Sequence, residues 1–222
     1  MSGPLRAGPP ASRAYADIPP CGAGQAIGLH GGSFNPPHAG HRHVSLIALS
    51  RLGLDQLWWL VSPGNPLKEH AQLASLAERM REAACVASHP RIVVTGLEAV
   101  HGIRFTADLA AFLSSRLRPV RFVWIMGSDN LVTFHRWERW RVIADRFPIA
   151  VINRPGSLAA PVNARAAVAM ARYRVDERDA GSLAGRRPPA WTFLTAPRTG
   201  ASSTILRLST APGVNEALRD TS

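Results

Sequence analysis

Short apolar runs alternate along this chain with segments whose apolar residues recur at helical spacing. We expect strands at six of these runs: 26–29, 57–61, 92–94, 120–126, 149–152 and 191–194. The helices expected around them cover 40–52, 73–88, 106–117, parts of 129–147, 161–172 and a segment that begins at 202. Nearly continuous apolar strands joined by crossover helices are typical of a parallel sheet covered on both faces. The alternation therefore predicts an α/β fold with a doubly wound parallel sheet of about six strands.

The length and composition favour one folded domain. With 222 residues, 46% of them apolar, the chain can bury a sizeable core. Residues 1–24 are rich in Pro, Gly, Ala and Ser without any period, so we expect a disordered leader there and a single domain over 25–222. No apolar run approaches the roughly 18 residues that a membrane span needs, and residues 1–20 lack the apolar segment of a secretory signal. Because the chain has only two cysteines, a disulfide scaffold is excluded, and a cytoplasmic protein without a membrane partner is expected.

The segment 30–41, His-Gly-Gly-Ser-Phe-Asn-Pro-Pro-His-Ala-Gly-His, follows the first expected strand and leads into the first helix. Gly31 and Gly32 let a ligand approach the backbone, and the free N–H groups of the helix start point to the same place. His38 and His41 are three residues apart and share one helical face. Two imidazoles there can donate hydrogen bonds to phosphate oxygens that gain charge in a transition state. The segment therefore predicts a polyphosphate site in which His38 and His41 are catalytic.

Other phosphate and metal motifs fit this loop less well. It has neither the G-x-G-x-x-G pattern of dinucleotide-binding folds nor the G-K-[ST] of a Walker A loop. A zinc site made of His38, His41 and His43 is an alternative. No cysteine and no H-E-x-x-H pattern accompanies these histidines, so we expect no resident metal.

The pattern G-G-x-F-x-P-x-H-x-G-H at 31–41 resembles the signature of the H-x-G-H nucleotidyltransferase superfamily. Residues 201–207, Ala-Ser-Ser-Thr-Ile-Leu-Arg, are similar to the second mark of that superfamily, I-S-x-T-x-x-R. The resemblance implies a Rossmann-like fold in which a serine and threonine cap a helix that faces phosphates. It also implies that Arg207 pairs with phosphate oxygens.

Three more segments resemble bacterial nicotinate-nucleotide adenylyltransferases. Residues 127–137 resemble their G-x-D-x-L…F-x-x-W stretch, 101–109 resemble S-Y-T-x-x-T-L, and 153–156 resemble R-R-P-G. The resemblance implies that nicotinate mononucleotide and ATP give nicotinate adenine dinucleotide and pyrophosphate, with Mg²⁺ accompanying ATP. The attacking phosphate is already ionised, so no protein base and no covalent intermediate is expected.

The resemblance also implies which residues bind each substrate. Those implied for ATP are Gly31, Gly32, Ser33, Phe34, His38, His41, Lys68, Gly127, Asp129, Arg154, Ser202, Ser203, Thr204 and Arg207. Those implied for nicotinate mononucleotide are Gly32, Ser33, Phe105, Thr106 and Trp137. Trp137 would stack on the pyridine ring, and backbone N–H groups near Phe105 and Thr106 would bind the carboxylate. Lys68 would replace a histidine that the family usually carries after the second strand.

Some positions depart from the family pattern, and three rival functions stay open. Phe105 stands where tyrosine is usual, and Asn153 replaces the first arginine of R-R-P-G. Two rivals are adenylyltransferases of the same fold that use pantetheine phosphate or nicotinamide mononucleotide. The third is a nucleic-acid-binding module, prompted by 26 Lys and Arg against 15 Asp and Glu. Because the arginines are scattered and no nucleic-acid-binding motif is found, we expect no nucleic-acid partner. A homo-oligomer is left open.

Overall fold

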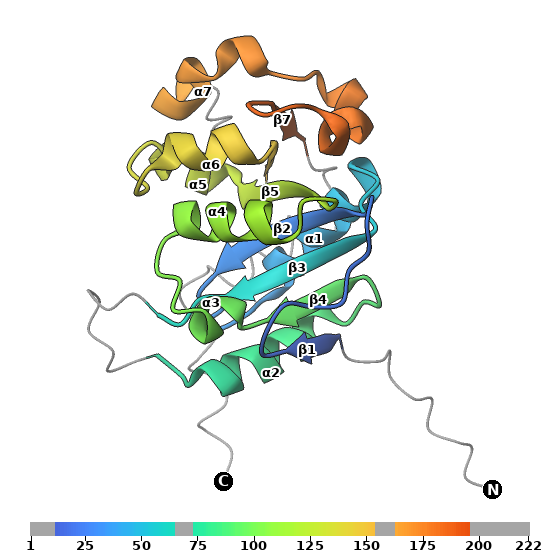
Figure 1. Cartoon of the computed structure of the whole chain (residues 1–222), viewed down its shortest axis with the longest axis vertical. Helices are drawn as coiled ribbons and strands as arrows, with labels where there is room; N and C mark the ends of the chain where they lie inside the picture. The colour runs from blue at the N-terminus through green and yellow to red at the C-terminus, as the bar shows by residue number, and fades with distance from the viewer. Residues whose placement is uncertain (1–11, 65–72, 154–162, 196–222) are drawn as a thin grey trace, which may run out of the picture.

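The computed structural model describes residues 12–64, 73–153 and 163–195. These residues form a single parallel sheet with helices packed against it (Figure 1). Its seven strands lie in the order β1-β4-β3-β2-β5-β6-β7, and every pair of neighbours runs parallel. The strands are β1 (Arg13–Tyr15), β2 (Ala26–Gly32), β3 (Gln56–Val61), β4 (Ile92–Thr95), β5 (Arg121–Gly127), β6 (Ile149–Ile152) and β7 (Trp191–Leu194). The chain adds β3 and β4 on one side of β2 and β5 to β7 on the other. The strand order therefore reverses between β2 and β5, which is where such sheets bind ligands.

The helices that join the strands largely confirm the expected segments. They are α1 (Ala39–Arg51), α2 (Leu76–Ala87), α3 (Leu97–Val100), α4 (Thr106–Arg116), α5 (Ser128–Phe134), α6 (Trp140–Arg146) and α7 (Arg165–Ala169). Two 3₁₀ segments follow, η3 (Ala171–Tyr173) and η4 (Glu177–Gly185), and α7 is shorter than the helix expected over 161–172. The helix expected from residue 202 lies outside the described residues. Among the described helices, none has the length and apolarity that crossing a bilayer requires.

The helix α2 begins three residues later than expected because Ser75 caps it. The Ser75 hydroxyl accepts a hydrogen bond from the Glu78 backbone N–H at 3.2 Å. The Glu78 carboxylate in turn accepts from the Ser75 backbone N–H at 3.0 Å. This reciprocal capping box satisfies N–H groups that would otherwise lack partners, so the helix starts after Ser75.

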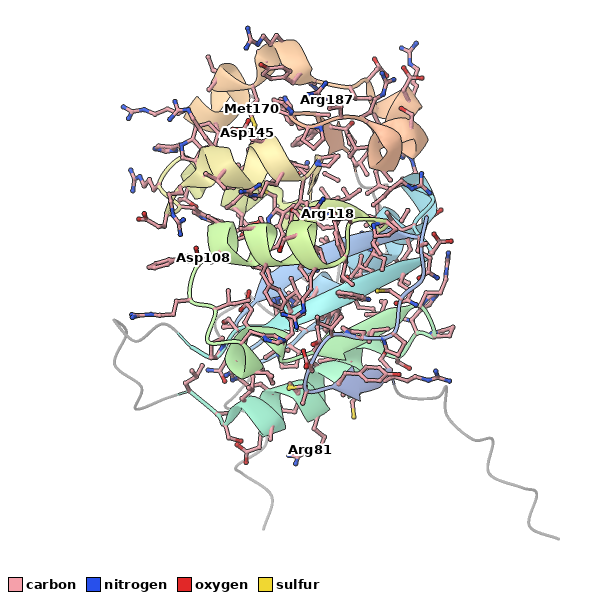
Figure 2. The ribbon with its side chains drawn as sticks, viewed as in Figure 1. Arg81, Asp108, Arg118, Asp145, Met170 and Arg187 are labelled. Carbon is pink, nitrogen blue, oxygen red and sulfur yellow. The ribbon has the colours of Figure 1, made fainter. Side chains whose placement is uncertain are left out.

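Helices cover both faces of the sheet and form two apolar cores. The neighbouring residues Trp58 and Trp59 of β3 are both fully buried, but they belong to different cores because successive side chains of a strand point to opposite faces. Buried residues of α4 to α7 complete the Trp58 core, and residues of α1, α2 and η4 complete the Trp59 core. Most charged side chains of the described residues lie outside the cores, as Figure 2 shows for Arg81, which projects from α2 away from the sheet; Arg79 of the same helix is buried.

The expectation of a disordered leader over residues 1–24 is wrong for residues 12–24, and the sheet accordingly has seven strands rather than about six. Strand β1 lies beside β4, with Arg13 opposite Val93 and Tyr15 opposite Thr95. The Thr95 hydroxyl also donates to the Asp17 carbonyl at 2.7 Å. A three-residue edge strand is too short to show a sequence period, and backbone pairing holds it. Residues 1–11 lie outside the described residues.

Deleting residues 1–16 is therefore expected to lower the melting temperature by about 3 °C or more. Loss of β1 removes its backbone pairing and uncovers β4, which we expect to cost on the order of 1 kcal/mol, and in a domain of this size 1 kcal/mol corresponds to about 2–4 °C. Circular dichroism melting curves measure the shift. A chain that lacks only residues 1–11 keeps β1 and is the control. Equal melting temperatures for both deletions would contradict a stabilising role for β1.

Candidate active site

The loop between β2 and α1 is held in an unusual conformation by aromatic packing. Phe34 has a φ of 46°, in the left-handed region that residues other than glycine seldom adopt. Its side chain is 1% exposed, and its ring stacks on Trp59 with centroids 4.8 Å apart and planes inclined by 16°. Packing of this quality can hold a strained backbone, and such strain is concentrated at functional sites. The loop therefore enters α1 in a defined orientation.

His38 and His41, the two residues predicted to be catalytic, lie together at the start of α1. Their ring centroids are 3.8 Å apart. His38, which we expected to share a helical face with His41, is the N-cap residue, and the helix begins at Ala39. A Cβ on Gly40 would lie 2.9 Å from the His38 ring, so glycine is needed between the two imidazoles.

The two imidazoles cap the helix reciprocally, and this defines which of their nitrogens carry protons. His38 Nδ1 accepts from the Gly40 N–H at 3.1 Å, and His41 Nδ1 accepts from the His38 N–H at 3.2 Å. An Nδ1 atom that accepts carries no proton, so each neutral ring has its proton on Nε2. Both rings thus offer an Nε2–H donor beside a helix N-terminus, where anions are favoured.

Three buried residues that the sequence analysis missed support His41. The Ser45 hydroxyl donates to the His41 carbonyl at 2.8 Å and accepts from the Trp59 indole N–H at 2.8 Å. His30 Nδ1 lies 3.3 Å from the same hydroxyl. Ser45 follows His41 by four residues, so it lies one helical turn further on the same side. That spacing was the only sequence signal for this network.

A cavity of about 290 Å³ opens at the carboxyl ends of the strands. Five predicted residues line it, namely Gly31, Gly32, Ser33, Thr106 and Trp137. Five residues that were not predicted also line it, namely Ser62, Glu98, Arg104, Trp124 and Asn130. A Cβ on Gly31 would lie 2.9 Å from the Trp124 ring, so glycine is required at this wall of the cavity.

None of the other predicted site residues that the structure describes, His38 and His41 included, lines this cavity. Phe105 is 45% exposed and precedes α4, while Gly127 ends β5 directly before α5. Asp129 is exposed in the first turn of α5. Buried Phe34 does not line the cavity either. Six of the predicted residues lie outside the described residues: Lys68, Arg154, Ser202, Ser203, Thr204 and Arg207.

A buried arginine lies directly behind the cavity wall. Arg79 of α2 is 1% exposed, and its Nη1 donates to the carbonyls of Ser33 at 2.7 Å and Ser62 at 2.8 Å. Its Nε donates to the Ala74 carbonyl at 2.9 Å. Within the described ranges no carboxylate forms an ion pair with it, and burial lowers the pKa of this guanidinium. An uncompensated positive charge behind the cavity favours anionic ligands.

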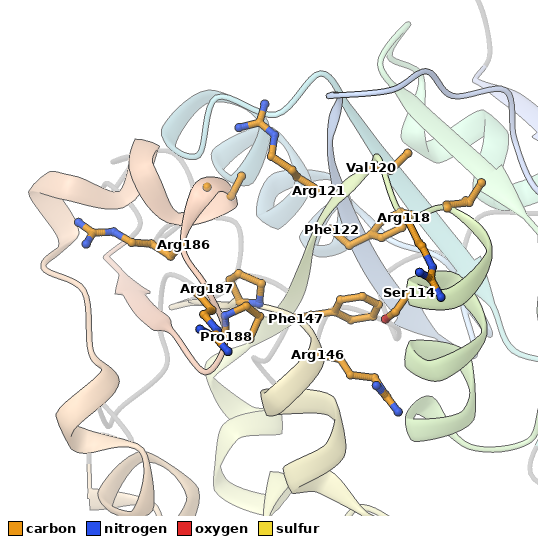
Figure 3. Close-up of a pocket in the computed structure, with 14 residues that line it drawn as sticks. Ser114, Arg118, Val120, Arg121, Phe122, Arg146, Phe147, Arg186, Arg187 and Pro188 are labelled. Atoms are coloured by element: carbon orange, nitrogen blue, oxygen red, sulfur yellow. The ribbon is translucent and has the colours of Figure 1, made fainter.

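A second hollow, of about 350 Å³, lies at the opposite end of the strands, where their amino ends meet (Figure 3). It is formed around the amino ends of β5 and β6 and the segment before β7. Its charged lining residues are all arginines, namely Arg118, Arg121, Arg146, Arg186 and Arg187. None of the predicted site residues within the described ranges lines it, so we place the chemistry at the carboxyl ends of the strands. Across the described ranges, no three His, Cys, Asp or Glu side chains are grouped to hold a metal ion.

A doubly wound sheet with two imidazoles on a helix start, beside a cavity that favours anions, defines a nucleotide-binding transferase of the α/β class. Residues 29–209 match the family model described as cytidylyltransferase-like. The chain is 56% identical over 181 residues to the "Probable nicotinate-nucleotide adenylyltransferase" of Brucella suis, which covers 82% of this chain and 93% of that relative. The chain therefore belongs to the cytidylyltransferase-like family and, within it, to the nicotinate-nucleotide adenylyltransferases.

A second relative agrees with this assignment, and a solved structure shares the fold. The protein of the same name from Rhizobium meliloti is 56% identical over 182 residues, 82% of this chain and 97% of that relative. In fold, the chain is similar to the nicotinic acid mononucleotide adenylyltransferase of Plasmodium falciparum complexed with NaAD. The TM-score is 0.56 at 17% identity, covering 80% of this chain and 78% of that one. The expected Rossmann-like α/β fold is thus confirmed.

Proposed function

We infer that this chain transfers the adenylyl group of ATP to nicotinate mononucleotide, giving nicotinate adenine dinucleotide and pyrophosphate for NAD biosynthesis in the cytoplasm. The observation that carries the reaction type is the His38–His41 pair at the start of α1. Neither imidazole lines the anion-favouring cavity, but Ser33 does, and the ring of the next residue, Phe34, lies 4.8 Å from that of His41. The name shared by the relatives at 56% identity supplies the two substrates.

The reaction needs positioning and charge neutralisation from the protein. A phosphate oxygen of nicotinate mononucleotide attacks the α-phosphorus of ATP, and a P–O bond forms. The bond from that phosphorus to the oxygen bridging to the β-phosphate breaks in line, and pyrophosphate leaves with the electron pair. The Nε2–H groups of His38 and His41 donate to the phosphate oxygens as charge develops, with His41 nearest the α-phosphate. No proton has to be removed from the attacking phosphate.

Mg²⁺ enters this scheme with ATP rather than as a resident ion. The residues next to His38 and His41 are glycines and a serine, and the described lining of the cavity has a single carboxyl group, Glu98, so no cluster of carboxylates is present there to hold Mg²⁺. ATP phosphates are suitable ligands, and Mg²⁺ bound to them would neutralise part of their charge. We therefore propose that no residue of the cavity holds Mg²⁺ before ATP binds.

The cavity is suited to the nicotinate ring and its carboxylate. Trp137 lines it and presents a flat aromatic surface for the pyridine ring. Thr106, the first residue of α4, lines it as well, and no side chain caps this helix in the described part of the chain. The first N–H groups of α4 can therefore donate to the nicotinate carboxylate.

Trp137→Ala is expected to raise KM for nicotinate mononucleotide about tenfold and to leave KM for ATP nearly unchanged. Loss of aromatic stacking and of apolar contact to the ring costs on the order of 1 kcal/mol or more. Initial rates at varied concentrations of each substrate measure both constants. Trp140→Ala is a matched control, because Trp137 and Trp140 pack edge-on against Phe134 with centroids 5.4 and 5.5 Å apart, yet only Trp137 lines the cavity. Equal effects of the two variants on KM would refute the stacking role.

Product analysis tests the proposed function itself. The purified chain is incubated with ATP, Mg²⁺ and one of three acceptors: nicotinate mononucleotide, nicotinamide mononucleotide or pantetheine phosphate. We expect nicotinate adenine dinucleotide and an equal amount of pyrophosphate with the first acceptor. Turnover of nicotinamide mononucleotide at an equal or higher rate at pH 7, or turnover of pantetheine phosphate, would overturn the assignment.

A further inference from the structure

Glu98 is an acidic residue in a cavity to which the proposed function assigns an anion. It lies on the short helix α3, which follows β4 at the carboxyl edge of the sheet, and it lines the cavity together with Thr106 and Trp137. Its side chain has no hydrogen bond or ion pair with any described residue, although its backbone carbonyl accepts from the Ile103 N–H at 2.8 Å. A carboxylate so close to the nicotinate carboxylate would repel it.

The protonation state of Glu98 decides whether this carboxyl group helps or hinders an anion. Burial raises the pKa of Glu98 to about 7. A neutral carboxyl group has an O–H that can donate a hydrogen bond, whereas an ionised one can only accept. Apolar surroundings are known to keep carboxylic acids neutral so that they serve as donors in other sites. Near neutral pH, Glu98 therefore exists in two forms with opposite preferences for a ligand.

Two arginines and one His–Asp pair are the charged groups nearest to Glu98. Arg104 lines the same cavity, and Arg79 lies behind Ser33 and Ser62. Their guanidinium groups give this region a positive charge. The other titratable pair near α3 is His101 and Asp17, whose Nε2 and Oδ1 are 2.7 Å apart, and neither residue lines the cavity.

We propose that Glu98 sets the choice between nicotinate and nicotinamide mononucleotide. Its neutral form donates a hydrogen bond to the nicotinate carboxylate. Its ionised form repels that carboxylate and instead accepts a hydrogen bond from the N–H₂ of a carboxamide. This inference rests on the proposed function, because it requires the pyridine ring in the cavity beside Trp137.

The proposal makes substrate preference depend on pH in one direction. The constant kcat/KM reports ionisations of the free enzyme, so the relevant transition lies near the pH at which Glu98 loses its proton. Below it Glu98 is neutral and nicotinate is favoured. As pH rises through about 7, the ratio of kcat/KM for nicotinate over nicotinamide mononucleotide falls. We expect a fall of about tenfold or more between roughly pH 6 and 8.5.

The ratio is the readout because the two mononucleotides share their ribose and phosphate. Ionisation of that phosphate, of ATP or of the imidazoles changes kcat/KM for both mononucleotides alike. These changes therefore cancel in the ratio of the two constants. The wild-type chain is assayed first, with Mg²⁺-ATP at a fixed concentration. Tryptophan fluorescence titrations with each mononucleotide give the same ratio from binding alone, since Trp124 and Trp137 line the cavity.

Two variants then assign the pH dependence to one residue. Glu98→Gln keeps the shape of the neutral side chain and its donor, so we expect a ratio that is constant with pH and about tenfold above wild type at pH 8.5. His101→Gln is the matched control on the same segment, and it should keep the wild-type profile. Circular dichroism checks that both variants fold.

The outcomes separate this proposal from the function on which it rests. A wild-type chain that makes nicotinate adenine dinucleotide with a ratio constant from pH 6 to 8.5 overturns the role of Glu98 and leaves the proposed function standing. A Glu98→Gln variant that keeps the wild-type fall also overturns it. If no nicotinate adenine dinucleotide forms at any pH, the proposed function fails first. If Glu98→Gln does not fold, the pH dependence of the wild-type ratio alone tests the role of Glu98.

Discussion

His41→Ala is expected to lower kcat about 100-fold or more while the fold stays intact. The variant removes an Nε2–H donor aimed at oxygens that gain negative charge in the transition state, and loss of one such donor typically costs this much. KM for ATP should change much less, because the donor acts most strongly in the transition state. Steady-state rates of pyrophosphate release measure both constants.

Two further variants separate the catalytic role of His41 from its role in capping α1. His41→Gln places an amide oxygen where it can still accept from the His38 backbone N–H, so the helix start is kept. We expect a low kcat in this variant as well. His43→Ala removes an imidazole from the same helix two residues further on and is the control for losing a ring. Wild-type kcat in a folded His41→Ala variant would exclude the catalytic role.

The sheet could be predicted from sequence because its strands are buried on both faces. Runs such as Leu57–Val61 and Ile149–Ile152 are apolar at every position, which leaves few alternatives to a central parallel strand. Strand β1 could not be predicted in this way. It has three residues at an edge, its side chains are largely exposed, and its pairing with β4 depends on a contact distant in sequence.

Only part of the site could be predicted, because some of its residues are close along the chain and others meet only through the strand order. His38 and His41 lie within one loop and one helix start, so their spacing along the chain already brings them together. Ser62, Glu98 and Arg104 follow two other strands, and they meet Gly31 only because the strand order puts β4, β3 and β2 side by side. The roles predicted for Lys68, Arg154 and residues 202–207 stay predictions, since these residues lie outside the described ranges.

Arg79→Met is expected to have the largest effect on stability, about 3 kcal/mol or more. The guanidinium of Arg79 donates to three carbonyls, of which those of Ser33 and Ser62 belong to the loops after β2 and β3. Methionine fills much of the same space but leaves these carbonyls without a donor in a buried place, at roughly 1–3 kcal/mol for each unsatisfied group. Urea unfolding followed by circular dichroism measures the free energy of unfolding.

The same variant should weaken substrate binding, because Arg79 joins the two loops that line the cavity and supplies positive charge behind them. Arg79→Lys separates these effects. Lysine keeps the charge but lacks the planar fork that reaches several carbonyls at once, so we expect a smaller rise in KM with much of the loss of stability retained. Arg81→Met is the control, since Arg81 lies two residues further along α2 and is exposed. If Arg79→Met unfolds at the same urea concentration as Arg81→Met, the three carbonyl contacts do not hold the two loops together.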